Sequence, residues 1–191
     1  MSQTIGDRNE GREVVNGNGG NGRAIIDPQA APTSAYAMYM QRALPGMKGD
    51  SMDDNVDTFA CGPTSFGFGL VVGRTAPHLL TVMMGGPDPV GLSLHDHTIA
   101  SRGGYTQYDA VSVLTRGRAW CQVTVGAEGP IDDGIYVSYD PATGMVSSAA
   151  GTALPNAVFR SKAVPFYDIN YVNSTFIALV EMHYPLAVPG P

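Results

Sequence analysis

The sequence has few charged residues and no long apolar run, and each shortage excludes a class of protein. Charged residues make up 15% of the 191 residues, below the quarter or so of an average domain. The 11 Lys and Arg residues form no cluster, so we expect no direct contact with nucleic acid. No stretch of about 18 apolar residues occurs, so no membrane-spanning helix is predicted. The first residues also lack the apolar segment of a signal peptide.

Cysteine is scarce as well. The two cysteines, Cys61 and Cys121, belong to no Cys-x-x-Cys pair and to no Cys and His spacing that is typical of a zinc site. A disulfide between them is one alternative. We favour the other, which is two free and partly buried thiols.

Glycine and proline are abundant, with 24 and 14 residues, and they favour short strands joined by turns over long helices. No helical periodicity appears beyond residue 45. Apolar runs bounded by Gly and Pro predict strands near residues 66–72, 79–84, 91–94, 110–115, 118–125, 134–139, 157–160 and 175–184. Between the fourth and fifth of these, Arg116 and Gly117 predict a tight hairpin. The fold class expected is all-β, a jelly-roll-like β-sandwich or a small barrel, with an extended N-terminal arm.

Two of these strands have informative side-chain patterns. Residues 118–125 alternate between two faces. One face has Trp120, Gln122 and Thr124, and the other has Ala119, Cys121, Val123 and Val125. Residues 175–184 are apolar on both faces. This pattern is typical of a strand inside a sheet, or of one covered by another subunit.

Residues 1–34 form a Gly- and Asn-rich segment that differs from the all-β domain expected over 35–191. The segment contains no aromatic residue and no Leu. Such a sequence cannot offset an ordering cost of about 1–2 kcal/mol per residue, so we expect a flexible arm. Its apolar knot contains Ile25 and Ile26, which are candidate contacts to a neighbouring protein subunit. The alternative is a tail without function.

A dense apolar cluster follows the arm. It is ended by Pro45 and Gly46, and its spacing suits either a short helix or a strand. We interpret the cluster as a second set of candidate contacts to a neighbouring protein subunit, and it consists of Tyr36, Met38, Tyr39, Met40 and Leu44.

His95 and His97 are the main polar residues that could carry chemistry. On a strand, side chains at i and i+2 point to one side, so the two imidazoles could share a metal, as in a cupin. However, no carboxylate follows His97 at the cupin position, and His183 is the only later histidine. We therefore favour a polar strand end, and we predict no metal and no other cofactor.

The sequence also lacks the local motifs of common enzymes. It contains no Gly-x-Ser-x-Gly elbow, no P-loop and no dinucleotide fingerprint. The acidic pairs at residues 53–54 and 132–133 could bind calcium or act as acid and base, but each lies beside a turn, where solvated Asp is common. We predict that the protein is not an enzyme.

Several segments, in their order and spacing, resemble the phage structural cement (capsid decoration) proteins. Residues 105–123, YTQYDAVSVLTRGRAWCQV, are the best match, where the family has Y-GDTVSVLRKGRVWV-V. Residues 133–137, DGIYV, lack the Pro of the family's GDPVYV. The other matching segments are residues 37–47, 67–73, 91–97, 154–161 and 176–182. Residues 1–34 match nothing in the family pattern.

The resemblance implies a structural protein of the virion, made in the host cytoplasm and bound to the outer surface of the phage head. There it would bridge major capsid protein subunits and stabilise the shell. It implies an oligomer, a homotrimer with a dimer as the alternative, and neither catalysis nor a cofactor. Another virion part, such as a tail or fibre adaptor, shares these sequence features. A cupin-like metalloenzyme is the remaining alternative.

Overall fold

The computed structural model describes residues 43–50, 53–76, 79–124, 126–127, 130–167 and 174–184. These ranges contain no α-helix and a single 3-10 turn, η1 (Ala100–Arg102). Within them no helix has the length and apolar character needed to span a bilayer. The all-β prediction is confirmed. The strands are β1 (Asn55–Cys61), β2 (Val71–Arg74), β3 (Thr81–Met84), β4 (Asp88–Ser93), β5 (Ala110–Val123), β6 (Tyr136–Tyr139), β7 (Val146–Ser147), β8 (Thr152–Phe159), β9 (Val164–Tyr167) and β10 (Ser174–His183).

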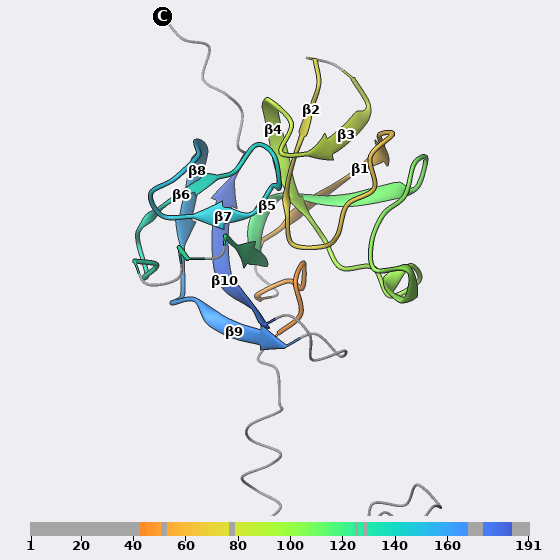
Figure 1. Ribbon diagram of the computed structural model, residues 1–191. Helices are drawn as coiled ribbons and strands as arrows, with labels where there is room; N and C mark the ends of the chain where they lie inside the picture. The colour runs from red at the N-terminus through yellow and green to blue at the C-terminus, as the bar shows by residue number, and fades with distance from the viewer. Residues whose placement is uncertain are drawn as a thin grey trace, which may run out of the picture. The chain divides into compact units, whose positions relative to one another are not determined.

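The strands pair in the order β1-β3-β2-β4-β5-β7-β6-β8-β10-β9, with further pairings β1–β5 and β5–β10. The β1–β5 pairing closes β1, β3, β2, β4 and β5 into a small five-stranded barrel, so the small-barrel prediction is confirmed. The β5–β10 pairing closes a second ring through β7, β6 and β8. Figure 1 shows β5 between the two groups of strands, as the member that both rings share.

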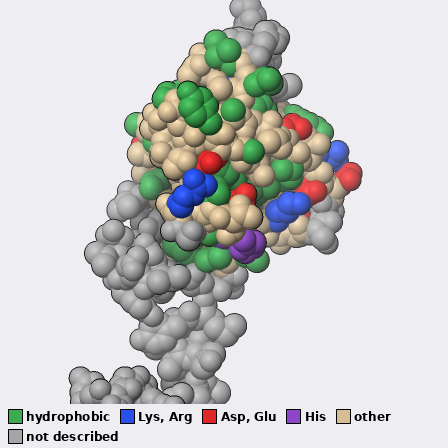
Figure 2. All heavy atoms as spheres, turned by 90° about the vertical axis from the view of Figure 1, so that its right-hand side faces the viewer, with side chains coloured by type: hydrophobic (Ala, Val, Ile, Leu, Met, Phe, Trp, Pro, Cys, Tyr) green, Lys and Arg blue, Asp and Glu red, His purple; other side chains and the backbone are tan. Residues whose placement is uncertain are grey.

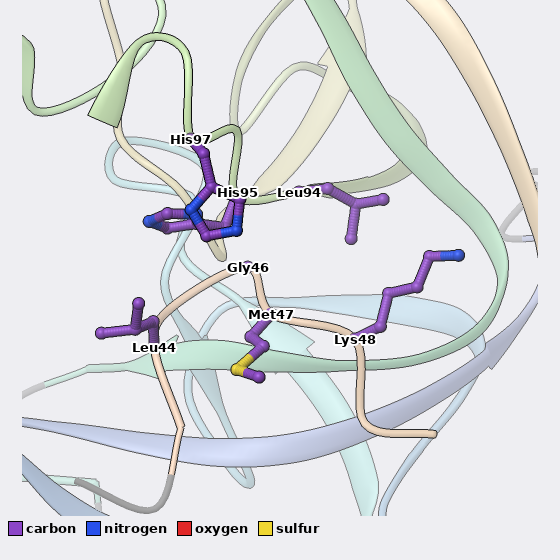
Figure 3. A pocket seen from close by; sticks show the side chains of 7 residues that line it. All are labelled: Leu44, Gly46, Met47, Lys48, Leu94, His95 and His97. Carbon is purple, nitrogen blue, oxygen red and sulfur yellow. The ribbon is translucent and has the colours of Figure 1, made fainter. Parts of the chain in front are cut away.

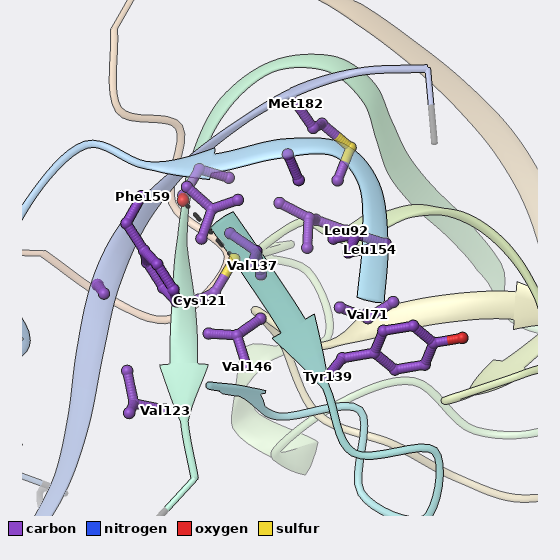
Figure 4. Close-up of a cluster of buried hydrophobic side chains, with 14 of the residues drawn as sticks. Val71, Leu92, Cys121, Val123, Val137, Tyr139, Val146, Leu154, Phe159 and Met182 are labelled. Atoms are coloured by element: carbon purple, nitrogen blue, oxygen red, sulfur yellow. Dashed lines mark hydrogen bonds between the residues drawn. The ribbon is translucent and has the colours of Figure 1, made fainter. Parts of the chain in front are cut away.

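The buried side chains form two hydrophobic cores, one inside the barrel and one mainly inside the second ring. The barrel core consists of Cys61, Phe66, Phe68, Leu70, Val72, Val82, Val90, Tyr105, Val111 and Val113. The second core is drawn in Figure 4. The second ring supplies most of it, but Val71 of β2 and Leu92 of β4 also belong to it, and its largest fully buried side chains include Tyr139, Phe159, Leu92, Leu114 and Met182. Burial of each large apolar side chain contributes about 1.5–3 kcal/mol, so a substitution such as Phe159→Ala should destabilise this core by about 3–5 kcal/mol.

The hairpin predicted at Arg116 and Gly117 is wrong. β5 continues through this position as one strand, because each half pairs with different strands and not with the other half. Residues before the position pair with β1 and β4, and residues after it pair with β10. Gly117 has a φ of +121°, and the register with β1 shifts beside Thr115. The local signal therefore marks a bulge that bends the strand and carries it from one ring into the other.

The alternation predicted along the second half of β5 is confirmed. Ala119, Cys121 and Val123 are buried, whereas Trp120 and Gln122 are only partly buried. β10 lies inside the sheet, with β5 on one side and β8 and β9 on the other, as its apolar character predicted.

Both cysteines are free and buried, so the prediction of free thiols is confirmed. Cys61 lies in the barrel core and Cys121 in the core of the second ring. Burial raises the pKa of each thiol, and that of Cys121 is raised strongly. Because they lie in separate cores, the two thiols cannot form a disulfide with each other without unfolding.

Candidate interaction surfaces

Residues 43–49, here called the base segment, lie along the second half of β5. The Gly46 N–H donates to the Trp120 carbonyl at 2.7 Å, and the Trp120 N–H donates to the Met47 carbonyl at 2.9 Å. The Gly49 N–H donates to the Arg118 carbonyl at 2.8 Å. These hydrogen bonds attach the base segment to β5.

Gly46 also attaches the base segment to the loop that follows β4. Its carbonyl accepts a hydrogen bond from the His95 N–H at 2.9 Å. The φ of Gly46 is +77°, and a Cβ at this position would lie 2.6 Å from the His95 nitrogen. Only glycine meets both requirements without strain, so the Pro45-Gly46 pair ends the apolar cluster by allowing a close backbone contact.

A pocket of about 320 Å³, here called the base pocket, lies between this segment and the β4 loop. Figure 3 shows the rings of His95 and His97 on one side of it and the side chains of Leu44 and Met47 on the other. Its lining residues are Leu44, Gly46, Met47, Lys48, Leu94, His95 and His97. The ammonium of Lys48 points away from the histidines and pairs with Asp54, so the lining is mainly apolar.

The two histidines meet, although they lie in the loop after β4 and not within a strand. Their ring centroids are 4.8 Å apart in an edge-to-face arrangement, and the His95 ring lies 4.7 Å from that of Phe68. Burial, and secondly the charge of His97, lower the pKa of His95, which favours a neutral imidazole at pH 7. His183 lies elsewhere, with its Nε2 3.0 Å from a carboxylate oxygen of Glu181. Among the described residues, no three His, Cys, Asp or Glu side chains form a group suited to a metal ion.

Of the seven candidate contact residues, the structure describes only Leu44, which lines the base pocket. The others lie outside the described residues, namely Ile25, Ile26, Tyr36, Met38, Tyr39 and Met40. The sequence analysis did not find the pocket itself. Leu94 and His97 come from a distant part of the chain, and only the fold brings them to Leu44.

A second surface, here called the apolar rim, consists of Leu79, Leu80 and Tyr108. Their exposed fractions are 42%, 76% and 82%. The rim flanks the end of β1, since the Ala60 N–H donates to the Leu80 carbonyl and the Tyr108 N–H donates to the Cys61 carbonyl. The rim therefore presents large apolar groups to solvent from both sides of one strand end.

Tyr108 has a φ of +71°, a region that bulky residues rarely adopt. A network of hydrogen bonds holds its turn in place. The Thr106 N–H and hydroxyl donate to Asp109 Oδ2 at 2.7 and 2.8 Å, and Arg102 pairs with the same carboxylate at 3.3 Å. The Thr106 hydrogen bonds, followed by Arg102, lower the pKa of Asp109. Strained backbone is often found at functional sites, and the Tyr108 ring at this position is 82% exposed.

Charged residues are few in the sequence as a whole, at 15%. Figure 2 shows one face on which Lys, Arg, Asp and Glu side chains gather in a few small groups among uncharged atoms. Large apolar side chains that are exposed elsewhere include Met47 at 49% and Tyr136 at 81%. A surface of this kind suits contact with other proteins, because the cores of protein interfaces are poor in charge and rich in aromatic residues and Met.

The acidic pairs of the sequence form separate ion pairs with cations. Asp53 lies 3.6 Å from Arg116, and Asp54 pairs with Lys48. In the other pair, Asp132 lies 3.6 Å from Lys162 and Asp133 lies 3.4 Å from Arg160. Each carboxylate therefore has a structural partner.

Glu181 on β10 is the centre of a charged network that the sequence analysis did not identify. Its carboxylate lies 2.7 Å from Arg118 and 2.9 Å from Arg160, and it is also close to His183. Arg118 extends the network to Asp50 at 3.1 Å, just after the base segment. Hydrogen bonding from Arg160, with smaller contributions from His183 and Arg118, lowers the pKa of Glu181 to about 2. The network thus ties the chain after the base segment to β5, β8 and β10.

Comparison with known proteins adds to this geometry. Residues 31–178 match the family model described as "Structural cement protein (E217 gp24/Pam3 gp6)". No curated protein matches the sequence. Among solved structures, a chain of "The capsid of Myoviridae Phage XM1" is similar, with a TM-score of 0.55 and 17% sequence identity. The similarity covers 78% of this chain and 97% of that one, and at this identity it shows a shared fold.

Proposed function

This chain belongs to the phage structural cement protein family, and from that premise we propose that it binds the outer surface of the phage head and bridges major capsid protein subunits. As a family member it is a structural protein of the phage capsid. The proposed action uses surface contact and no chemical transformation of a substrate. The tail or fibre adaptor and the cupin-like enzyme have no observation that favours them.

The observation that carries the proposal beyond the family is the apolar rim. Leu80 and Tyr108 are 76% and 82% exposed, and Tyr108 also has a strained backbone with positive φ. Burying each of these side chains against a partner would contribute about 1.5–3 kcal/mol. Part of this contribution is offset by the loss of motion on association. A modest net gain, repeated at every seam of a shell, would stabilise the whole particle.

We further propose that residues 1–34 form an arm separate from the β domain and that the protein acts as a homotrimer, with a dimer as the alternative. Residues Tyr36–Leu44 would then lie at a subunit contact. The family resemblance supports the oligomer, and the Gly- and Asn-rich composition supports the arm. Sedimentation of the full chain at several concentrations distinguishes the trimer, the dimer and the monomer.

The test of the proposed function is binding to heads purified without this protein. The wild-type chain should sediment with the heads, whereas Tyr108→Ser and Leu80→Ser should each bind at least about tenfold more weakly. Tyr136→Ser is the matched control, because Tyr136 is equally exposed on the other ring, and it should bind normally. Failure of the wild-type chain to bind would refute the function. Normal binding by both rim variants would refute only the role of the rim.

A further inference from the structure

The base pocket is an apolar site without an assigned occupant, and it lies where the N-terminal segment joins the β domain. The side chains of Leu44, Met47 and Leu94 line it together with the two imidazoles. Its volume of about 320 Å³ is at the lower end of the roughly 300–1,000 Å³ typical of sites that hold small groups. The pocket therefore suits one or two aliphatic side chains better than a folded element.

The lining makes other occupants unsuitable. The ammonium of Lys48 points away from the histidines and pairs with Asp54. Lys48 is therefore not positioned to bind an anion in the pocket. The His95 N–H of the backbone is already bonded to Gly46. The pocket thus offers few free hydrogen-bonding groups to an occupant. An apolar group would bind best there, because it would displace water from an apolar lining.

The sequence outside the described residues supplies a matching group. Forty-two residues precede Ala43, and within residues 1–34 the longest run with large aliphatic side chains is the knot at residues 24–26. Seventeen residue steps separate Ile26 from Ala43, which allows a reach of up to about 58 Å in extended backbone. Pro28 and Pro32 lie between them, and each favours extended backbone at itself and at the residue before it. A linker of this length allows the knot to reach the pocket of another copy.

We propose that the base pocket of one copy binds the side chains of Ile25 and Ile26 from a neighbouring copy. This inference rests on the proposed function, which places copies side by side on one shell. Each copy would give its knot to one neighbour and receive a knot from another, so that the cement copies are linked to one another as well as to the shell. Because the pocket lining and the knot are both mainly apolar, their contact would exclude water.

The test joins the knot and the pocket with a disulfide. Full-length Ile26→Cys chains are mixed with tagged Met47→Cys chains on heads, oxidised gently and separated without reductant. Met47 lines the pocket and is 49% exposed, so the cysteine there should be accessible. Cys61 and Cys121 are buried and should not react. Any disulfide between the two kinds of chain must join different copies. We expect at least five times more of this mixed disulfide than in a control in which the second cysteine lies outside the pocket.

The control replaces Met47→Cys with Tyr136→Cys, a residue as accessible but on β6. Absence of the mixed product, or equal amounts with the control, would overturn the inference. A second variant carries both Ile26→Cys and Met47→Cys in one chain. If it forms only a disulfide within the chain, the knot binds its own pocket and the inference is overturned. Sedimentation with heads is scored separately and reports on the proposed function alone. If the wild-type chain does not bind heads, the same mixture is oxidised in concentrated solution, where the same products support or overturn the inference.

Discussion

Replacing Glu181 with glutamine tests whether the charged network holds the second ring together. Gln keeps the shape of the side chain and removes its charge from between Arg118 and Arg160. The pKa of Glu181 is about 2, against an ordinary value of 4.5. By linkage, a difference of this size corresponds to at most about 3 kcal/mol. The two arginine side chains are about one third exposed, so solvent screening reduces the expected loss of stability to about 1–2 kcal/mol at pH 7.

The pH dependence identifies charge as the cause. Because the folded pKa of Glu181 is depressed, its contribution is fully present above about pH 4.5 and is lost as pH falls toward 2. The difference in unfolding free energy between wild type and Glu181→Gln should therefore be constant near neutral pH and should shrink across this acidic range.

Urea unfolding followed by tryptophan fluorescence at several pH values measures this difference, with Trp120 on β5 as the single reporter. Asp133→Asn is the control, because its side chain is 67% exposed and lies 3.4 Å from Arg160, so it should change stability little. A Glu181→Gln loss that stays the same from pH 7 to pH 3 would mean that packing, and not charge, explains the effect. No loss at pH 7 would refute the network's contribution.

Three further predictions follow from single positions. Gly46→Ala should lower the free energy of unfolding by about 2 kcal/mol or more, because a Cβ at this position would clash with backbone atoms. Gly134 has a similar φ but nothing within 4 Å of its Cβ position, so Gly134→Ala should lower it by only about 1 kcal/mol. Urea unfolding of both variants checks this difference. Cys61 and Cys121 should react with a thiol reagent only in urea, and rapid reaction of the folded protein would contradict their burial. Tyr108→Asn should raise the melting temperature by a few degrees, because Asn tolerates a positive φ, and should weaken head binding; a lower melting temperature would contradict the strain argument.

The sequence allowed the fold class and most strands to be predicted because the signals for them are local. Alternation along residues 118–125 and the apolar faces of β10 depend on the two-residue repeat of a strand, and burial in the structure follows both. The hairpin at Gly117 failed for a physical reason. A glycine with positive φ serves a bulge as well as a turn, and only the partners of each half of β5 distinguish the two.

The interaction surfaces were harder to predict. Leu44 was identified from composition, but the base pocket also needs Leu94 and His97, which tertiary pairing brings to it. Tyr108 gave no sequence signal as a contact, because its exposure depends on the turn that Asp109 and Thr106 build. Glu181 was missed for a similar reason, since its two arginines come from β5 and from the residue that follows β8.

Electron cryo-microscopy of the virus particle tests the central claim most directly. The account predicts many copies of this β domain on the outer surface of the head, at the junctions between major capsid protein subunits, with Leu80 and Tyr108 buried in the contact. Density for the domain only at the tail, or none in the particle, would contradict it.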